Sequence, residues 1–432
     1  MKNDGELAVG EVSSDSSRHV RHASRPRLAV VISHPIQHFA PLFRDLAKEP
    51  NLELRVFYCC DWGISDYADP GFGRTFKWDI PLLDGYEHEF LTIAKRPRDL
   101  GFFSIDNPTV ASRLTQFDPD AVWVHGYGHR TSWRTLRWAN SNRRRVLYFG
   151  DSELLAPRSW KSRLLKRLFL PRYFSRCDRF LTIGDNNETY YRHYGVPQQK
   201  LIRGSFPIDV ARFQNATVSL NDDDRRRLRT RYGLRPDAFV VLFLGKMIDI
   251  KRPLDVVHAV AKLRERIPHL QAMMLGSGPL GNVVRSEINR LELQGRVILP
   301  GFVNQTEMPQ ALWLGDVLLM VSEKDPHPLA VSEAMSVGNA VIASNRVGCV
   351  GPTDAARLGE NALTYPVGDI SALAECIASL AEDERLLRRM QQRSVQLSKT
   401  QDTAVMVRAI LQALERGPDT CVTANNAILS HE

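Results

Sequence analysis

The sequence predicts an α/β protein of two domains, each built around a parallel β-sheet. Short apolar runs rich in β-branched residues recur along the chain, and amphipathic, helix-like stretches separate them. Strands that read as continuous apolar runs are typical of parallel sheets with helices on both faces. The runs form two series divided by a polar segment, and 432 residues exceed the length of most single domains.

The first series predicts an N-terminal domain over residues 27–214. It opens with LAVVIS and the helical pattern FAPLFRDLAKE, and its further strand candidates are LELRVFYCC, DAVWVHG, RRVLYFG and RFLTIG. Residues 1–26 before it are rich in serine and charge, and they lack the apolar segment of a secretory signal. We therefore expect residues 1–26 to form a disordered tail.

The second series predicts another domain over residues 231–385. Its strand candidates are FVVLFLG, LQAMMLGSG, VILPGFV, VLLMVS and AVIAS, and the helical pattern LDVVHAVAKLRERI follows the first of them. Residues 215–230 are polar and charged without an apolar strand, so we interpret them as a linker. Residues 386–417 carry helical patterns that we expect to pack back across the domains, and residues 418–432 are expected to form a tail.

The composition is that of a soluble globular protein. Hydrophobic residues make up 43% and charged residues 25% of the sequence. No run of about 18 consecutive apolar residues offers a transmembrane helix. The six cysteines lack metal-ligand spacing, which favours reduced thiols. We therefore expect a cytoplasmic protein that needs no metal or other cofactor.

One basic segment accounts for nearly all of the excess positive charge. Residues 158–179 hold eight Lys and Arg side chains against one acid, Asp178, which gives a net +7 out of the formal +8 of the chain. Trp160, leucines and further aromatic residues are interleaved with the charges, a pattern that suits the surface of an anionic membrane. An ordinary amphipathic helix packed on its own domain explains the pattern equally well. Nucleic-acid binding is disfavoured, because no recognised nucleic-acid module accompanies the charge.

The stretch DPHPLAVSEAMSVG, residues 325–338, carries the most chemical information. It follows the predicted strand VLLMVS, and Pro326 and Pro328 fit the first turn of a helix. The N–H groups at such a helix start bind anions such as a diphosphate. Glu333, further along the helix, suits the vicinal hydroxyls of a ribose. A solvated acidic face is the alternative, but the apolar strand that follows argues against it.

Three further loops in the second series follow predicted strands and fit a nucleotide ligand. Gly245, Lys246 and Lys251 follow FVVLFLG, where two cations suit a diphosphate leaving group. Gly276 and Gly278 follow the next strand and let the backbone approach a ligand closely. A fourth loop, GFVN, includes Val303 and offers a backbone edge to a nucleobase. Each loop alone is a weak signal, and only their order is specific.

The N-terminal domain contributes candidate site residues from three predicted loops. They are His34, Gln37 and His38 in the first strand-to-helix loop, His125 in VWVHGYG and Asp151 in YFGDSE. The carboxyl ends of the strands in such sheets open on a ligand crevice, so these side chains are expected to face the cleft between the domains. Packing under the first helix is the alternative for His38, and a hydrogen-bonded loop position is the alternative for His125.

Taken in order, the motifs F-x-G-K…K, G-x-G-P-L, G-F-V and [DE]-x7-E-A-M-x-x-G resemble the retaining family-4 glycosyltransferases. The resemblance implies the GT-B architecture, in which two Rossmann-like domains face a cleft. The N-terminal stretches HPIQHFAPLFRDLA and HYGVP are similar to members that build bacterial surface polysaccharides and exopolysaccharides. The implied activity is sugar transfer from a nucleotide-sugar donor to a lipid-linked or polysaccharide acceptor, with retention of configuration and without a metal.

The resemblance also implies roles for individual residues. The C-terminal domain would hold the donor and the N-terminal domain the acceptor. The implied donor contacts are Lys246 and Lys251 at the diphosphate, Glu333 at the ribose, Asp325 and His125 near the transferring sugar, Gly276 and Val303 at the base, and the helix start from Pro326 through His327 to Leu329 at the phosphates.

Two departures from the family pattern bear on activity. Asp325 stands where the family has glutamate, and His327-Pro328 replace the usual aromatic-glycine pair, which removes an N–H at Pro328. A catalytically weak or silent nucleotide-sugar-binding protein is therefore one alternative. A nucleotide-sugar epimerase of the same fold is another.

Overall fold

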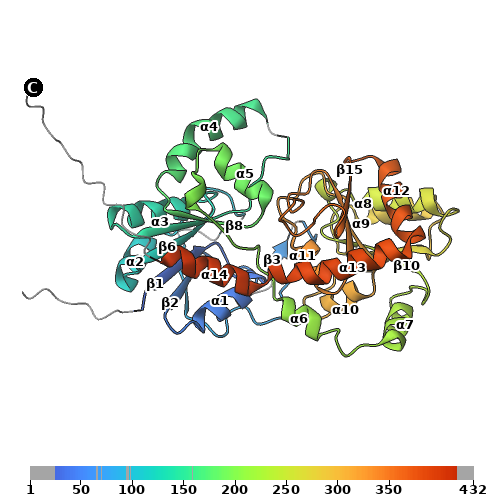
Figure 1. Cartoon of the computed structure of the whole chain (residues 1–432). Helices are drawn as coiled ribbons and strands as arrows, with labels where there is room; N and C mark the ends of the chain where they lie inside the picture. The colour runs from blue at the N-terminus through green and yellow to red at the C-terminus, as the bar shows by residue number, and fades with distance from the viewer. Residues whose placement is uncertain are drawn as a thin grey trace, which may run out of the picture.

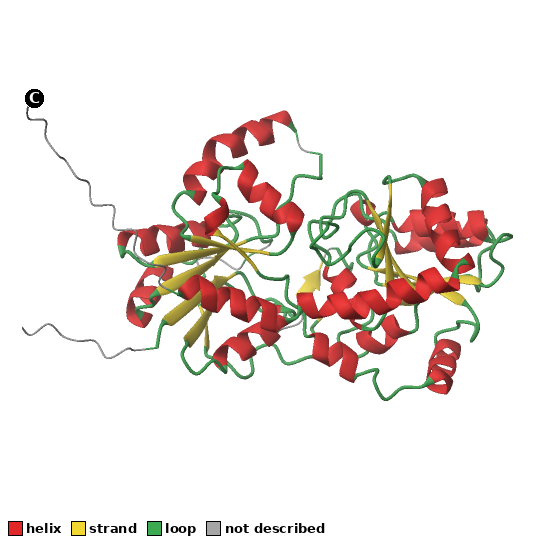
Figure 2. Cartoon of the chain, in the orientation of Figure 1, coloured by secondary structure: helices red, strands yellow, loops and turns green. Residues whose placement is uncertain are grey.

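The computed structural model describes residues 25–415 except 65–66, 70, 94–96, 98 and 158, and it shows two α/β domains (Figure 1). Each domain has a parallel sheet with helices packed against its faces (Figure 2). The predicted fold class, two Rossmann-like domains with parallel sheets, is confirmed. Of the two predicted tails, residues 1–24 and 418–432 lie outside the described residues.

The sheet of the N-terminal domain winds outward from strand β1 in both directions. Its strand order is β5-β2-β1-β6-β7-β8-β9, and the paired strands are parallel. The strands are β1 (Arg27–Ile32), β2 (Glu53–Tyr58), β5 (His88–Phe90), β6 (Ala121–His125), β7 (Arg145–Phe149), β8 (Arg179–Thr182) and β9 (Leu201–Arg203). Because β1 lies between β2 and β6, the loops after β1 and β6 meet at a topological switch point, where α/β proteins bind ligands.

Helices cover both faces of this sheet and enclose two apolar cores. The helices are α1 (Phe39–Ala47), α2 (Val110–Phe117), α3 (Arg130–Ser141), α4 (Trp160–Phe174) and α5 (Asp185–His193), with a short 3-10 helix η1 (Gln198–Lys200). Outside the sheet, β3 (Tyr67–Asp69) and β4 (Arg74–Phe76) form an antiparallel hairpin.

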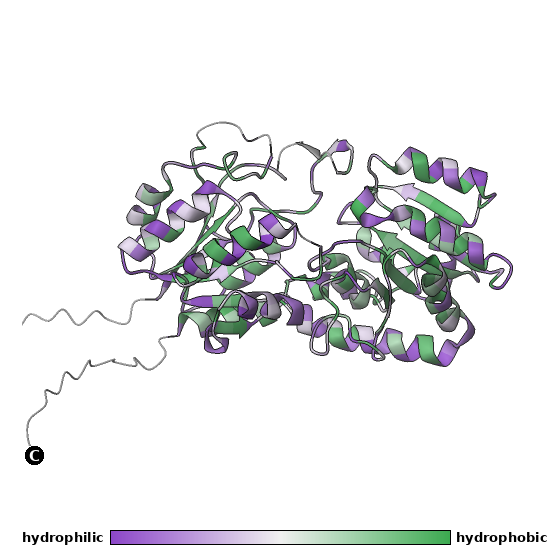
Figure 3. Cartoon of the chain, turned by 90° about the horizontal axis from the view of Figure 1, so that it is seen from above, coloured by the Kyte–Doolittle hydropathy of each residue, from purple (hydrophilic) through white to green (hydrophobic). Residues whose placement is uncertain are grey.

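The sheet of the C-terminal domain has the order β12-β11-β10-β13-β14-β15, again with parallel pairs. The strands are β10 (Phe239–Leu244), β11 (Leu270–Leu275), β12 (Val297–Gly301), β13 (Val317–Met320), β14 (Ala340–Ser344) and β15 (Ala362–Tyr365). Here β10 lies between β11 and β13, so the loops after β10 and β13 meet at a second switch point. In Figure 3 the strands are coloured mainly hydrophobic, as expected for sheets covered on both faces.

The helices of the C-terminal domain follow its strands. They are η2 (Asp249–Lys251), α8 (Pro253–Leu263), α9 (Gly281–Arg290), α10 (Met308–Trp313), α11 (Leu329–Ser336), α12 (Ile370–Glu382), α13 (Glu384–Ser398) and η3 (Lys399–Gln401). The last helix, α14 (Thr403–Leu414), returns to the N-terminal domain and packs against α1, β8 and β9. Within the segment 386–417, α13 packs against α11, α12 and β14 of the C-terminal domain, whereas α14 packs against the N-terminal domain.

The segment predicted as a linker, residues 215–230, is largely helical in the structure. Between α6 (Val210–Asn215) and β10 lies α7 (Asp222–Arg231), which begins with a capping box formed by Asn221 and Asp224. The buried Arg229 anchors α7 to the C-terminal domain by donating to the carbonyl of Leu314 and the carboxylate of Asp316. The helix is held by a buried arginine rather than by an apolar stripe, so its sequence lacks the usual hydrophobic period.

Among the described residues, no helix is both long enough and apolar enough to cross a membrane. The cysteines in this part of the chain are free, and they are Cys59, Cys60, Cys177, Cys349 and Cys376. Cys421 lies outside the described residues.

Candidate active site

A cavity of about 720 Å³ lies between the two domains. Both switch points open into it, so strand-to-helix loops of each sheet supply its walls. The predicted site residues that line it are His34, Gln37, Gly245, Lys246, Lys251, Gly276, Val303, Asp325, His327, Leu329 and Glu333. The structure therefore brings most of the candidates from both halves of the sequence to one place.

The start of α11 forms one wall of the cavity. Its N-cap residue, Pro328, makes no side-chain cap, and Leu329 and Ala330 in its first turn line the cavity. The first N–H groups of a helix have no acceptor within the helix, and they carry the positive end of its dipole. This wall is therefore suited to an anionic group.

Two lysines complete the electropositive wall. Lys251 forms an ion pair with Asp325, joining the loops after β10 and β13. The Nζ atom of Lys246 lies 4.9 Å from the centroid of the Phe72 ring. Asp325, the residue that departs from the family pattern, thus balances the charge of Lys251 beside the helix start.

Glu333 is buried in the cavity wall, and burial raises its pKa to about 7, an effect that the nearby Arg212 and a hydrogen bond from Gln305 oppose. Arg212 on α6 donates to the backbone oxygen and to Oε1 of Gln305, both at 2.7 Å. Neither Arg212 nor Gln305 stands in a sequence motif, so neither is among the predicted site residues. Together they hold a carboxylate whose charge titrates near neutral pH.

The two predicted glycines after β11 differ in what they do. Gly276 lines the cavity at a positive φ of 139°, and a Cβ there would clash with the carbonyl oxygen of Gly245. Gly278 does not line the cavity, in contrast to its predicted ligand contact. A Cβ at Gly278 would meet the oxygen atoms of Met247 at 2.6 Å and Gly71 at 2.8 Å. Gly278 therefore permits close approach of two protein loops rather than of a ligand.

A segment of the N-terminal domain, residues 71–79, crosses to the C-terminal domain and forms what we name the aromatic strap. Ser277 Oγ donates to the Phe72 carbonyl at 2.8 Å, and Asn304 Nδ2 donates to the Lys77 carbonyl at 3.0 Å. The rings of Phe72 and Trp78 lie 5.2 and 6.3 Å from that of Phe302. All three rings line the cavity beside Val303. None of residues 71–79 is among the predicted site residues.

His38 and His125 do not line the cavity, contrary to the prediction. His38 packs between Phe39 and Phe206, with ring centroids 4.5 and 5.0 Å away, and neither of its ring nitrogens has a hydrogen-bond partner. His125 packs 5.0 Å from Phe149 and its Nδ1 is likewise buried without a partner. Burial, and then the charges of neighbouring histidines, lower the pKa of each to about 3. Both rings lie in an aromatic layer beneath the cavity as neutral side chains.

Asp151 also lies outside the cavity lining. Its side chain keeps an exposed surface, yet the protein around it desolvates the carboxylate and raises its pKa. His327 and Asp325 are among the charges that act on it. Asp151 therefore belongs to the polar surroundings of the site without contacting the cavity.

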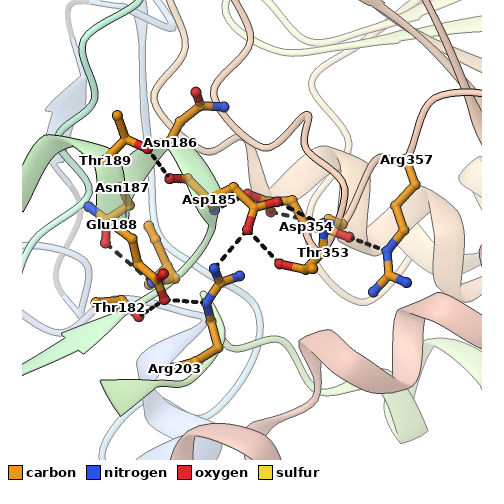
Figure 4. Close-up of polar contacts among 12 residues, drawn as sticks. Thr182, Asp185, Asn186, Asn187, Glu188, Thr189, Arg203, Thr353, Asp354 and Arg357 are labelled. Carbon is orange, nitrogen blue, oxygen red and sulfur yellow. Dashed lines mark hydrogen bonds and ion pairs between the residues drawn. The ribbon is translucent and has the colours of Figure 1, made fainter. Parts of the chain in front are cut away.

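Polar contacts join the two domains (Figure 4). Arg203 donates to Asp185 at 2.8 Å and to Glu188 at 2.6 Å within the N-terminal domain. Asp185 in turn contacts Thr353 and Asp354 of the C-terminal domain.

Within the described residues, no group of three or more His, Cys, Asp or Glu side chains is arranged to hold a metal ion.

Comparisons with known proteins agree with this architecture. Residues 224–396 match the family model described as "Glycosyl transferases group 1". The chain is 28% identical over 171 residues to the N-acetyl-alpha-D-glucosaminyl L-malate synthase of Bacillus anthracis, covering 40% of this chain and 43% of that protein. It is also 28% identical over 208 residues to the D-inositol 3-phosphate glycosyltransferase of Streptomyces bingchenggensis, covering 46% and 44%. The matches span less than half the length of these two relatives.

A solved structure extends the likeness over nearly the whole chain. The crystal structure of Anabaena Alr3699/HepE in complex with UDP superposes with a TM-score of 0.69 at 17% identity, covering 90% of this chain and 99% of that one. At this identity the likeness concerns the fold, which is the GT-B arrangement of two Rossmann-like domains. The family match and the two relatives confirm the resemblance to bacterial glycosyltransferases drawn from the motif order.

Assigning Glu333 to the ribose of a nucleoside diphosphate predicts an affinity that depends on pH, because burial raises the pKa of this carboxylate to about 7. Under this assignment the ionised carboxylate would accept hydrogen bonds from both ribose hydroxyls, and the ionised fraction rises as the pH passes 7. We expect calorimetry to show that the wild type binds UDP roughly tenfold more tightly at pH 8 than at pH 6. This factor is counted after subtracting the pH-dependent change in affinity that the Glu333→Gln variant shows. The variant serves as the control for titration of the diphosphate. Equal pH profiles for the two proteins would contradict the ribose assignment.

Proposed function

We propose that this protein is a retaining family-4 glycosyltransferase that moves a sugar from a nucleoside diphosphate to an acceptor. The observation that carries the proposal is the convergence of three groups on one cavity. The α11 start and the two lysines suit a diphosphate, and the buried Glu333 suits a ribose. The match to the group 1 glycosyl transferases covers the domain that contributes these groups.

In this proposal the cavity residues stabilise the departing diphosphate. Lys246, Lys251 and the first N–H groups of α11 oppose the negative charge that grows on the phosphate oxygen as its bond to the sugar breaks. The acceptor hydroxyl bonds to the same sugar carbon on the face that the diphosphate leaves, which retains the configuration. The hydroxyl proton passes to the departing phosphate. No divalent metal takes part in these steps.

A UDP-linked sugar is the first donor to consider, because a protein of the same fold was crystallised with UDP. The aromatic strap supports a donor that is enclosed by both domains. Its rings and Val303 form the part of the wall that is available to a base.

A donor screen tests the proposed activity. We expect product from one nucleotide sugar with membrane extract as acceptor source, no loss of rate with EDTA, and the donor's anomeric configuration in the product by NMR. Lys246→Ala should lower kcat about 100-fold, since it removes a cation from the leaving group. Lys262→Ala, an exposed lysine of the same domain, should leave kcat unchanged.

Other outcomes of the screen would contradict the proposal in distinct ways. Conversion of the donor sugar without an acceptor would indicate an epimerase. Nucleotide binding without turnover of any donor would indicate a silent binding protein. An inverted anomeric centre would exclude the retaining mechanism.

The acceptor in this proposal is attached to a lipid, and helix α4 supports that view. Trp160, Leu164 and Leu168 recur at four-residue spacing on one face, and they are 64%, 51% and 55% exposed. Leu165 is exposed beside them. Leu170, Tyr173 and Phe174 instead face the domain core. Helix α4 therefore has two apolar faces, one packed against the domain core and one exposed.

Basic side chains flank the exposed face of α4. Lys161, Arg163, Arg167 and Arg172 are exposed on this helix, while Arg158 of the predicted basic segment lies outside the described residues. An apolar face with flanking cations suits an anionic bilayer surface.

A second exposed apolar group lies in the loop before α2. Phe103 is 80% exposed in the loop before α2, and Phe102 beside it contacts Trp133, which contacts Phe169 of α4. Leu100 in the same loop lines the cavity. The loop therefore lines the cavity through Leu100 and, through Phe102 and Trp133, is connected to α4.

Vesicle sedimentation tests the membrane contact. We expect binding that needs anionic lipid and falls as salt rises, since each cation near the surface contributes about 1 kcal/mol and is screened within roughly 10 Å. Changing Lys161, Arg163, Lys166 and Arg167 to Gln should weaken it. The charge-matched control changes Arg226, Arg227, Arg385 and Arg389, which lie on the C-terminal domain. Equal effects of the two variants, or no binding at low salt, would contradict the proposal and favour a soluble acceptor.

A further inference from the structure

Helix α5 begins at the domain boundary without a cap from its own segment. Its N-cap residue, Gly184, makes no side-chain hydrogen bond, and the N–H of Asp185 instead donates to Oδ2 of Asp354 at 2.9 Å. A carboxylate at a helix N-terminus is stabilised by the free N–H groups and by the helix dipole. Asp354 of the C-terminal domain therefore caps a helix of the N-terminal domain (Figure 4).

The contact is reciprocal, and each half of it needs a glycine. The carboxylate of Asp185 accepts hydrogen bonds from the backbone N–H of Thr353, at 2.8 Å, and from its hydroxyl. A Cβ at Gly184 would clash with the Asp354 carboxylate, and one at Gly351 would clash with the Asp185 carboxylate. We name these five residues the interdomain latch. In each direction, a carboxylate of one domain lies against a glycine of the other domain, where no side chain blocks the contact.

The latch reaches the cavity through His327. Oδ1 of Asp354 lies 3.0 Å from His327 Nε2, and the two side chains are 0% and 1% exposed. His327 lines the cavity in the loop that leads into α11, whereas Asp354 does not line it. In a pair this buried, the carboxylate fixes the orientation of the ring.

A second connection runs through the backbone. Asn186 on α5 donates to the carbonyl oxygens of Gly348 and Val350, at 3.1 and 2.9 Å. The N–H of Gly348 donates to the carbonyl oxygen of Asp325 at 2.8 Å. Two chains of hydrogen bonds that start at α5 of the N-terminal domain therefore hold the loop 325–328, one at Asp325 and one at His327.

We propose that Asp354 is a positioning residue that couples domain closure to the geometry of the donor loop, residues 325–328. When the domains close, Asp354 accepts the α5 N–H and holds His327, which sets the loop at the start of α11. When they separate, the buried carboxylate loses a donor, so the loop is held less firmly. This inference rests on the proposed function, since the loop is the wall assigned to the diphosphate and the transferring sugar.

The first experiment separates a positioning role from a structural one. We expect Asp354→Asn to lower kcat at least tenfold while the Kd of UDP changes less than threefold. Adding His327→Ala to Asp354→Asn should lower kcat little further, because Asp354 acts through His327. Asp369→Ala, which removes the cap of α12 within one domain, is the control for lost stability. An unchanged kcat, or the same loss in the control, would overturn the inference.

The second experiment does not depend on catalysis. Gly184→Ala should lower the thermal unfolding midpoint in the wild-type background and have no effect in Asp354→Ala, where the clashing carboxylate is gone. Equal effects in the two backgrounds would overturn the inference of an interdomain latch.

If Asp354→Asn does not fold, Thr353→Val serves as a milder variant. It should lower kcat as well, by a smaller factor. If the wild type transfers no sugar while the Gly184 and Asp354 effects remain coupled, the proposed function fails and the latch stands.

Discussion

The site depends on one constraint, which is that every paired strand of each main sheet runs in the same direction. Parallel strands deliver their following loops to a single edge, and in each domain the switch point of the strand order opens a crevice there. In the folded chain the two crevices face each other, and together they form one cavity. Helix α11 starts at this edge, so its free N–H groups point into a space that is enclosed by protein on both sides.

Electrostatics within the cavity follow from that arrangement. The loops after β10 and β13 lie side by side, which brings the ammonium group of Lys251 into an ion pair with Asp325. Glu333 is buried in the same cavity wall, where desolvation outweighs the charge of Arg212 and raises the pKa of the carboxylate to about 7. In the proposed function, a nucleoside diphosphate would meet a wall in which Lys251 is already paired with Asp325.

The sequence predicted the parts of the site that local motifs carry. Lys246, Lys251, Gly276, Val303 and Glu333 each follow a recognisable strand, so their positions at the sheet edge could be inferred from pattern alone. His38 and His125 were placed by the same logic, but packing decided otherwise. Aromatic neighbours enclose both rings, and a loop sequence does not show which side of the loop a ring occupies.

The parts that the sequence did not predict are contacts between distant segments. Phe72 meets Phe302, Arg212 meets Gln305, and Asp185 meets Asp354, and no spacing or period in one sequence relates such partners. Helix α7 was missed for a related reason, because a buried arginine takes the place of the apolar stripe.

A crystal structure of the protein grown with UDP would test the central claim most directly. The account predicts electron density for the diphosphate between the first turn of α11 and the ammonium groups of Lys246 and Lys251, with the ribose hydroxyls at Glu333. Ordered UDP bound elsewhere, with this cavity occupied only by solvent, would contradict it.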